Sequence, residues 1–348
     1  MTGHAPATRP LRVLLAGFSG LGTQDHQTDM YLPAFSAHPG FEVAAVAGDE
    51  PQARSAAERL GVPLVADVAT AVGDVDADVV SVCVRPEERA ETAVRALENG
   101  RHVLVDKPAA TGVPEAAAIA AAASAAGRVC LPAHHQRFAP GVRAARAAVG
   151  GGRVGLPWNI QTDFLVGAGD PVPEGELVNF AVYPVDIVLA VTGQPVHRVH
   201  ALTAGAPGPS GAERTAVLML DHAHGVTSTI VVGRGADGIA APGTVFHRHR
   251  ISGSAGVLVV DAAGPVLTVR GAAGARALPF DSGSVPALLD ELHGAITEGR
   301  PADPDIKDAL AVARVVAAAR TSLRTGLPVD IAAQPQPGST PAAPTPTA

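Results

Sequence analysis

Residues 102–108 read His-Val-Leu-Val-Asp-Lys-Pro, a short apolar run that ends in an acid, a lysine and a proline. In an α/β sheet of parallel strands, the ligand crevice lies outside the carboxyl ends of the strands. A lysine that directly follows such a strand faces whatever the sheet binds. Lys107 is therefore the first candidate for chemistry.

A second apolar run, residues 11–16, leads into a glycine-rich turn made of Gly17, Phe18, Ser19, Gly20, Leu21 and Gly22. Such a turn lets the backbone approach a pyrophosphate at a helix N-terminus, so it predicts a dinucleotide site. The middle glycine of the usual G-x-G-x-x-G pattern is Ser19 here, with Gly20 displaced by one. A tight strand-to-helix connection also needs glycine, so the turn alone leaves a purely structural role open.

Composition sets the class of protein. A chain of 348 residues exceeds the usual size of a single core, which favours two domains. The net charge of −7, the absence of a basic block and the 3% aromatic content argue against a nucleic-acid partner. No apolar segment has the length of a signal or membrane-spanning helix, and Cys83 and Cys130 lie inside apolar runs. We expect a cytoplasmic protein with reduced core thiols and no membrane partner.

The first 132 residues alternate strand and helix patterns, which predicts a Rossmann fold, a doubly wound parallel sheet that binds a dinucleotide over residues 11–132. The expected strands are 11–16, 41–47, 79–84, 102–105 and 128–131, and the expected helices are 51–60, 87–99 and 114–126. The polar residues 23–31 interrupt this alternation. We expect them to form an elaborated loop over the cofactor or the active site, with Pro33 near a helix start.

Residues 133–332 predict an α+β substrate and oligomerisation domain with an open, mostly antiparallel sheet. Its expected strands are 158–166, 196–204, 215–220, 225–232, 247–253 and 256–260, and its expected helices are 180–191, 285–298 and 305–324. Residues 1–10 are expected to be flexible. Residues 333–348 are almost entirely Ala, Pro, Gln, Thr, Ser and Gly, which predicts a disordered tail.

In this order, the glycine turn, the Asp-Lys-Pro strand end and the mixed second half resemble the Gfo/Idh/MocA family of oxidoreductases over residues 11–331. The resemblance implies an NAD(P)-dependent enzyme. Family members carry Glu-Lys-Pro where this chain has Asp106, Lys107 and Pro108, and their lysine contacts both the nicotinamide side of the cofactor and the substrate. It thus implies that Lys107 and the shortened acid Asp106 line the cofactor site.

A second landmark of the family is an Asp-x-Gly-x-His segment at a helix start, whose histidine acts as general acid/base. Here Asn179, Ala181 and Tyr183 replace the acid, the glycine and the histidine, while Asp186 keeps a later acid. Tyrosine at this place also resembles the sugar-oxidising and diol-oxidising branches. A phenol with its ordinary pKa near 10 needs a neighbouring cation to act as a base, and Lys107 is the expected one.

The resemblance implies catalytic roles for Lys107, Tyr183 and Asp186, and a place near the substrate for Asn179 and His135. Each has a plainer alternative. A lysine at a strand end is often solvated, a tyrosine beside a proline often packs, and Asp186 could cap a turn or pair with an arginine. Asn179 cannot hold charge, which leaves open a changed substrate or a silent protein.

Cofactor choice depends on Asp49 and Glu50, which follow the second expected strand. An acid here bonds the adenosine ribose in NAD enzymes and repels a 2′-phosphate, so Asp49 favours NAD over NADP. Both acids could instead cap the helix before Pro51, and Arg54 could accommodate NADP. Arg85 and Pro86 fall where the family has a loop near the nicotinamide ribose. Arg85 and Arg89 could meet an anionic substrate or the cofactor phosphates, although we expect Arg89 to be a solvated helix residue.

Histidine pairs occur at 134–135, 222/224 and 247/249, and residues 25–29 hold Asp25, His26 and Asp29. No set has companion ligands at an established metal spacing, so no metal is predicted. Alternation along a strand puts His222 with His224, and His247 with His249, on common faces that we expect to be exposed.

The sequence therefore predicts hydride transfer between nicotinamide and a small polar substrate such as a sugar, a cyclitol or a related specialised metabolite. Lys107 and Tyr183 would handle the proton, and the chain would form a homo-oligomer through its C-terminal sheet. Imine reduction or a redox-cycling elimination with the same cofactor, and a catalytically silent dinucleotide-binding protein, remain alternatives.

Overall fold

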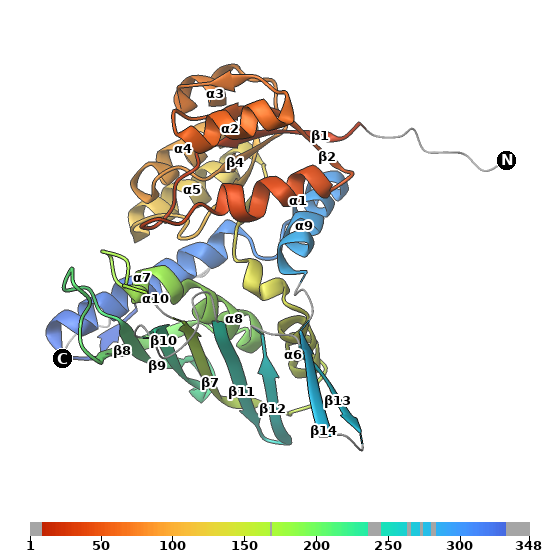
Figure 1. Ribbon diagram of the computed structural model, residues 1–348. Coiled ribbons are helices and arrows are strands. Elements are labelled where there is room, and N and C mark those ends of the chain that lie inside the picture. The colour runs from red at the N-terminus through yellow and green to blue at the C-terminus, as the bar shows by residue number, and fades with distance from the viewer. Residues whose placement is uncertain are drawn as a thin grey trace, which may run out of the picture.

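The computed structural model describes residues 9–167, 169–235, 245–262, 266–271, 274–279 and 283–331 (Figure 1). Residues 1–8 and the tail 333–348 lie outside these ranges, so the flexibility expected of them stays a prediction. The described chain forms two sheets, one in the upper half of Figure 1 and one in the lower half, with helices between them.

The first sheet has six parallel strands in the order β3-β2-β1-β4-β5-β6. They are β1 (Leu11–Ala16), β2 (Phe41–Ala47), β3 (Leu64–Val65), β4 (Val79–Val82), β5 (His102–Val105) and β6 (Cys130–Pro132). The strand order reverses between β1 and β4, and this switch point is where doubly wound sheets bind ligands. The predicted Rossmann sheet is confirmed.

Helices cover both faces of this sheet, which explains why its strands read as continuous apolar runs. Val13 and Leu15 pack with α1 (Leu32–Ala37), α2 (Pro51–Leu60) and α9 (Ser284–Glu298), while Leu14 and Ala16 belong to the core with α3 (Val68–Asp74), α4 (Pro86–Glu98), α5 (Val113–Ala126) and the start of α10 (Ile306–Thr325). The sequence assigned α9 to the second domain, yet its buried face packs on the first sheet.

Several elements were not predicted, among them α3, α6 (Pro140–Gly150), β13 (Val266–Gly271), β14 (Gly274–Pro279) and β15 (Val329–Asp330). Two further ones are too short to show a period. β3 has two residues, and residues 27–31 form a π-helix (Gln27–Tyr31) that runs directly into α1. Pro33 lies in the first turn of α1, where its missing N–H costs nothing. The free thiols of Cys83 and Cys130 are buried, as predicted.

The second sheet has seven strands in the order β12-β11-β7-β10-β9-β8-β15. They are β7 (Pro157–Val166), β8 (Val196–Ala204), β9 (Thr215–His222), β10 (Thr227–Arg234), β11 (Val245–Gly253), β12 (Gly256–Asp261) and β15 (Val329–Asp330). β7 and β10 run parallel and the other pairs antiparallel, as the predicted open, mostly antiparallel sheet requires. A separate hairpin joins β13 (Val266–Gly271) to β14 (Gly274–Pro279).

Helices cover one face of this second sheet (Figure 1). They are α6 (Pro140–Gly150), α7 (Glu176–Phe180), α8 (Val182–Thr192) and the second half of α10. The expected helix over residues 180–191 corresponds to α8, which holds Tyr183 and Asp186 in its first turns, and the short helix α7 precedes it and ends at Phe180. Asn179 in α7 and Tyr183 in α8 lie near the junction of the two halves.

The prediction for the strand histidines is wrong in its second part. His247 and His249 share a face of β11, but that face is the buried one, because Ile251 on the same side packs into the core. Arg248 and Arg250 occupy the exposed positions instead. His222, the last residue of β9, is also buried and lies 2.8 Å from the Ser228 hydroxyl. His224 lies beyond the strand in a 3-10 turn and is exposed, so for this pair the expected common face is wrong as well.

Within the described ranges, the helices are all too short or too polar to cross a membrane. In the same ranges, no group of three or more His, Cys, Asp or Glu side chains is arranged to hold a metal ion.

Candidate active site

The glycine turn after β1 is built for close backbone approach. Gly17 has φ +81°, and a Cβ placed on it would lie 2.6 Å from a side-chain carbon of Val84. A Cβ on Gly20 would lie 2.5 Å from the backbone oxygen of Gln24. Both positions therefore require glycine. Ser19, which stands where the middle glycine is usual, donates its hydroxyl to Glu50 at 3.0 Å.

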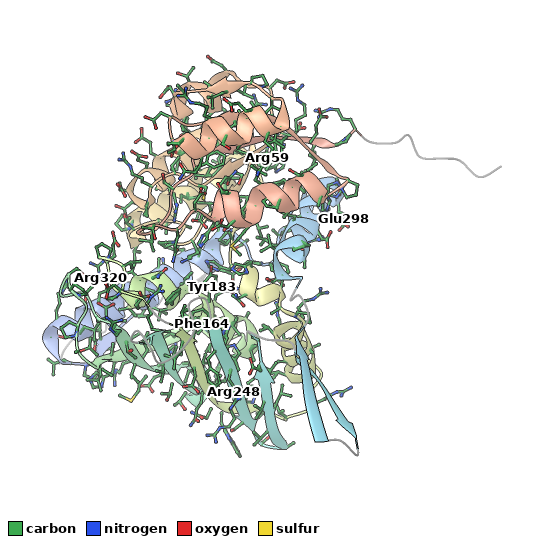
Figure 2. All side chains as sticks on the ribbon, viewed as in Figure 1. Arg59, Phe164, Tyr183, Arg248, Glu298 and Arg320 are labelled. Atoms are coloured by element: carbon green, nitrogen blue, oxygen red, sulfur yellow. The ribbon has the colours of Figure 1, made fainter. Side chains whose placement is uncertain are left out.

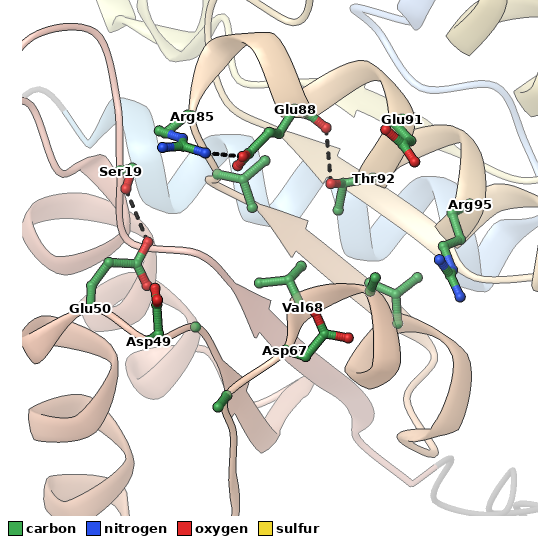
Figure 3. A pocket seen from close by; sticks show the side chains of 15 residues that line it. Ser19, Asp49, Glu50, Asp67, Val68, Arg85, Glu88, Glu91, Thr92 and Arg95 are labelled. Carbon is green, nitrogen blue, oxygen red and sulfur yellow. Dashed lines mark hydrogen bonds and ion pairs between the residues drawn. The ribbon is translucent and has the colours of Figure 1, made fainter.

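A cavity of about 470 Å³ opens beside this turn, at the carboxyl ends of β2 and β4 (Figure 3). Acidic side chains outnumber basic ones around it. The acids are Asp49, Glu50, Asp67, Glu88 and Glu91, and the bases are Arg85 and Arg95. A site with this excess of negative charge disfavours an additional phosphate.

The acid that faces the turn is Glu50, while the predicted Asp49 lines the same cavity beside it (Figure 3). Glu50 Oε1 accepts hydrogen bonds from the Phe18 backbone N–H at 3.2 Å and from Ser19. Its Oε2 is buried and has no hydrogen-bond partner among the described residues. Glu50 is the N-cap residue of α2, but its side chain does not cap that helix. A ribose hydroxyl is the kind of donor that Oε2 lacks, so these residues fit an adenosine ribose.

Arg85 and Pro86 follow β4 at the rim of the first sheet. Arg85 is exposed and forms ion pairs with Glu87 at 3.6 Å and with Glu88, and Pro86 is the first residue of α4. Arg85 thus lines the cavity with its charge already matched by neighbouring acids (Figure 3).

The prediction that Arg89 is solvated is wrong, because its side chain points inward from α4 and is fully buried. It donates to the backbone oxygens of Val84 at 3.1 Å and Pro108 at 2.9 Å. Its third nitrogen lies 2.9 Å from Asp106 Oδ2. Arg89 therefore ties the ends of β4 and β5 together beneath the active site.

Asp106 is the centre of a buried cluster. Its Oδ1 accepts the Tyr31 hydroxyl at 2.6 Å and lies 2.9 Å from His26 Nδ1. Burial alone would raise the pKa of Asp106, but His26 and the charge of Arg89 hold it well below its usual range. The shortened acid is therefore ionised, and it fastens the segment 23–31 to the end of β5.

Lys107 is buried and held by neutral oxygens. Its Nζ donates to Asn179 Oδ1 at 2.8 Å, to the Asn179 backbone oxygen at 3.1 Å and to Gln24 Oε1 at 3.0 Å. Burial lowers the pKa of Lys107 to about 8, although the charge of Asp106 opposes this. The amine can therefore take up and release a proton near neutral pH.

Tyr183 lies between the two halves, next to Phe164 (Figure 2). Lys107 Nζ lies over the Tyr183 ring, 5.5 Å from its centroid, while the hydroxyl oxygen lies 3.2 Å from His135 Nε2. Burial and the charge of Asp106 raise the pKa of Tyr183 well above 10. The expected lowering by Lys107 is therefore absent, and the phenol stays protonated as a donor.

His135 lies behind this phenol. Its Nδ1 lies 3.1 Å from the Ser284 hydroxyl, so both ring nitrogens face a polar group. Burial lowers the pKa of His135 to about 3, which keeps the ring neutral at physiological pH. A neutral imidazole can accept a hydrogen bond from the Tyr183 hydroxyl, which holds the phenol in place.

Asp186 is not brought to Lys107. Its two oxygens are taken by Arg137 Nε at 2.7 Å, by a second Arg137 nitrogen and by His134 Nδ1 at 2.8 Å. Burial opposes ionisation, but Arg137 and His134 lower the pKa of Asp186 to about 2. Because Arg137 also binds Asp303 at 2.8 Å, this cluster fixes α8 to the chain that leads into α10.

Several residues around the centre had no recognisable signal in the sequence. Gln24 and His26 come from the polar segment expected to cover the site, but no spacing showed which of its side chains reach Lys107 and Asp106. Glu176 contacts Asn179 from within α7, where the predicted helix had not yet begun. Only Glu50 had a visible cue, since it immediately precedes Pro51.

Comparison with known proteins places this geometry in context. The family model described as an oxidoreductase family with an NAD-binding Rossmann fold matches residues 11–134, and the model of the GFO/IDH/MocA C-terminal domain matches residues 142–259. Together they cover most of the chain.

Individual relatives share part of the sequence. A 1,5-anhydro-D-fructose reductase of Ensifer adhaerens is 40% identical over 93 residues, which span 27% of this chain and 28% of that reductase. A dTDP-3,4-didehydro-2,6-dideoxy-alpha-D-glucose 3-reductase of Streptomyces violaceoruber is 28% identical over 282 residues, 75% of each chain. The solved structure of scyllo-inositol dehydrogenase from Lactobacillus casei, with bound NAD(H) and scyllo-inositol, superposes with a TM-score of 0.79 at 16% identity, over 93% of this chain and 100% of that one.

Proposed function

The chain belongs to the Gfo/Idh/MocA family of oxidoreductases, and from that premise we propose that it is an NAD-dependent dehydrogenase or reductase acting on a polyhydroxylated sugar, a cyclitol or a related specialised metabolite. The observation that carries the proposal is the buried Lys107, which directly follows β5, binds Gln24 and lies over the ring of Tyr183.

The residues around the cavity suit NAD rather than NADP. The glycine turn meets the cavity at Ser19, Glu50 offers a buried acceptor to the adenosine ribose, and the surrounding acids repel a 2′-phosphate. When bound, the nicotinamide cofactor supplies the hydride donor or acceptor.

Lys107 and Tyr183 are proposed to handle the proton on the substrate oxygen. In the reducing direction, the protonated phenol of Tyr183 donates to the developing alkoxide, and Lys107 stabilises the negative charge. In the oxidising direction, Lys107 in its neutral form is proposed to accept the substrate proton, since burial lowers its pKa to about 8, while the Tyr183 hydroxyl keeps its contact with His135 Nε2 at 3.2 Å. Asp186 holds this arrangement in place rather than exchanging protons itself.

The substrate class follows from the polar groups at the centre and from the relatives. Asn179, Gln24 and Lys107 offer fixed donors and acceptors of the kind that recognise neighbouring hydroxyls. Two curated relatives are named as reductases of an anhydrosugar and of a nucleotide-linked deoxysugar, which supports a sugar-like substrate.

Titration calorimetry with NADH and NADPH separately tests the cofactor, and a panel of sugars, cyclitols and their keto forms with that cofactor then tests the reaction. We expect tighter binding of NADH and turnover that is lost in Lys107→Met and lowered about 100-fold in Tyr183→Phe. Absence of binding to either cofactor would contradict the enzyme and favour a silent protein.

A second copy of the chain is proposed to cover the free face of the second sheet. Register across β9, β10, β7, β11 and β12 aligns Met219 with Val259 on that face, and Leu202, Phe246 and Val257 are also exposed. Light scattering should report a dimer or tetramer, and Val259→Asp should shift it toward the monomer.

A further inference from the structure

Behind Lys107 lies a second layer of polar side chains. The amide of Asn179 stands between the lysine and Glu176, with Oδ1 accepting from Lys107 Nζ at 2.8 Å and Nδ2 donating to Glu176 Oε2 at 3.0 Å. All three residues are buried. The amide therefore has a defined direction, with its oxygen toward the cation and its nitrogen toward the carboxylate.

The remaining oxygen of Glu176 is also occupied. Oε1 accepts from the Val172 backbone N–H at 3.2 Å and from Arg234 Nε at 3.0 Å. A carboxylate accepts and cannot donate, so Glu176 can bind Asn179 only through the amide nitrogen. This leaves the amide oxygen for Lys107.

A second amide follows the first. Gln24 Nε2 donates to Asn179 Oδ1 at 3.1 Å, and Gln24 Oε1 accepts from Lys107 at 3.0 Å. If the Asn179 amide were reversed, its nitrogen would face two donors, Lys107 and Gln24. The amides of Asn179 and Gln24 together form what we call the lysine cage around Lys107, and their orientation therefore depends on Glu176.

Charged groups surround this cage without touching the lysine. Those that act on Lys107 are Asp106 at the end of β5, Arg89 on α4, Glu176 on α7 and Arg234 on β10. Asp106 pairs with Arg89, and Glu176 with Arg234. The atoms that contact Lys107 Nζ are thus neutral oxygens, fixed in place by an ion pair one layer further out.

We propose that Glu176 is a positioning residue for Lys107. By holding the amide nitrogen of Asn179, it turns the amide oxygen toward the ammonium group and thereby orients Gln24 as well. The catalytic consequence rests on the role proposed above for Lys107, but the cage itself can be observed without turnover.

The chain offers a direct probe, because its 348 residues include two lysines, Lys107 and Lys307. Protein labelled with ¹³C at the lysine side chain should give two ε-carbon signals in NMR. Lys307 is exposed at the start of α10 and serves as the internal reference. Titration of the Lys107 signal then reports the state of the cage.

Glu176→Gln should disturb Lys107 more than Glu176→Ala, although both remove the same charge. The glutamine amide introduced at this position would keep its oxygen toward the two donors Val172 N–H and Arg234, so its nitrogen would face Asn179. That donor forces the Asn179 amide to reverse and present its nitrogen to Lys107. We expect the titration midpoint of Lys107 to fall by about one pH unit more in Glu176→Gln than in Glu176→Ala, the equivalent of one charged hydrogen bond.

A swap of the two side chains should restore the cage. In Glu176→Gln combined with Asn179→Asp, the glutamine nitrogen donates to the new carboxylate, which accepts from Lys107 with its other oxygen. The net charge equals that of the wild type, and the Lys107 midpoint should return to or exceed the wild-type value. Glu213→Gln is the matched control, because Glu213 binds the Leu177 N–H of the same helix without reaching Asn179, and it should leave the Lys107 signal in place.

Equal midpoints in Glu176→Gln and Glu176→Ala, or a swap that fails to restore Lys107, would overturn the proposal. If Glu176→Gln does not fold, the rescue is scored on the melting temperature, and a swap that stays unfolded counts equally against it. A restored Lys107 signal without turnover on any substrate would instead contradict the proposed reaction while leaving the positioning role intact.

Discussion

The cavity beside the glycine turn and the centre around Lys107 both lie at the carboxyl ends of strands in the first sheet, yet their charges are arranged in opposite ways. The cavity is open and carries five acids against two arginines. The lysine centre is closed, its cation contacts neutral oxygens, and the neighbouring carboxylates Asp106 and Glu176 each pair with their own arginine. In the proposed function, the open region would select the cofactor by repulsion, and the closed region would use the lowered pKa of Lys107 to exchange a proton.

The largest effect should come from removing the cation of the closed region. Lys107→Met keeps the length of the side chain but loses the charge and the exchangeable proton. We expect kcat on the best substrate of the panel to fall about 10³- to 10⁴-fold, with NADH affinity nearly unchanged because the cavity is intact. Lys307→Met, at an exposed site, is the control. Retained turnover in Lys107→Met would remove the functional contrast between the two regions.

Acid should unfold the protein through its buried, neutral histidines. Burial lowers the pKa of His135 to about 3 and of His249 to about 4, and it lowers the pKa of His247 as well. In the unfolded chain these histidines bind protons near pH 6.5, whereas in the folded protein they stay neutral. Acid therefore favours the unfolded state, and stability is lost as the pH falls below 6.5.

These three histidines together should lower the free energy of unfolding by about 4 kcal/mol between pH 7.5 and 5.5, and His102, whose pKa burial also lowers to about 4, adds to the drop. The lowered pKa of Asp186, about 2, does not contribute in this window, since its stabilisation is lost only as the pH falls below about 4. Urea unfolding at several pH values measures the slope. His249→Gln should reduce the slope of unfolding free energy against pH by the contribution of one proton. A free energy that does not change with pH would show that these rings are charged in the folded protein.

A moderate effect is expected from the acid that faces the glycine turn. Glu50→Gln keeps the size of the side chain but weakens its bond to the adenosine ribose and removes one negative charge. We expect the Kd for NADH to rise about 10-fold, equivalent to one charged hydrogen bond, and the Kd for NADPH to fall or stay constant. Calorimetry with both cofactors measures the ratio, and an unchanged ratio would contradict the role of Glu50 in selection.

The smallest effect sharpens the assignment between neighbouring acids. Asp49 lines the cavity but makes no contact with the glycine turn among the bonds found in the described residues. Asp49→Asn should therefore change the Kd for NADH by less than about threefold, in the range of an exposed charge. If Asp49→Asn raised the Kd for NADH more than Glu50→Gln does, Asp49 rather than Glu50 would be the acid that binds the adenosine ribose.

The sequence was informative wherever function coincides with a strand end. Continuous apolar runs located the strands of the first sheet, and the residues directly after them, Gly17, Asp106 and Lys107, lie at the expected edge. Glu50 was displaced from the predicted Asp49 by a single position, because the backbone between β2 and α2 decides which of two adjacent acids turns back toward the glycines. Composition cannot resolve a choice that depends on a few dihedral angles.

Contacts between distant segments were out of reach. Gln24 meets Asn179 and His26 meets Asp106 across long separations in sequence, and no local pattern encodes such pairs. Alternation correctly put His247 and His249 on one face, but the sequence could not show which face packs against α8. Arg89 was taken as solvated because charged residues rarely lie inside, and its buried partner Asp106 becomes its neighbour only when β4 and β5 are paired.

The helix α10 has a mechanical consequence. Its first residues, Ile306 and Ala309, pack into the core of the first sheet, and Val312, Val315 and Ala319 pack into that of the second. Twenty continuous residues form a rod about 30 Å long that both halves grip. The helix therefore couples the two halves, because a large change in the angle between them would require the helix to bend or one core to release its end.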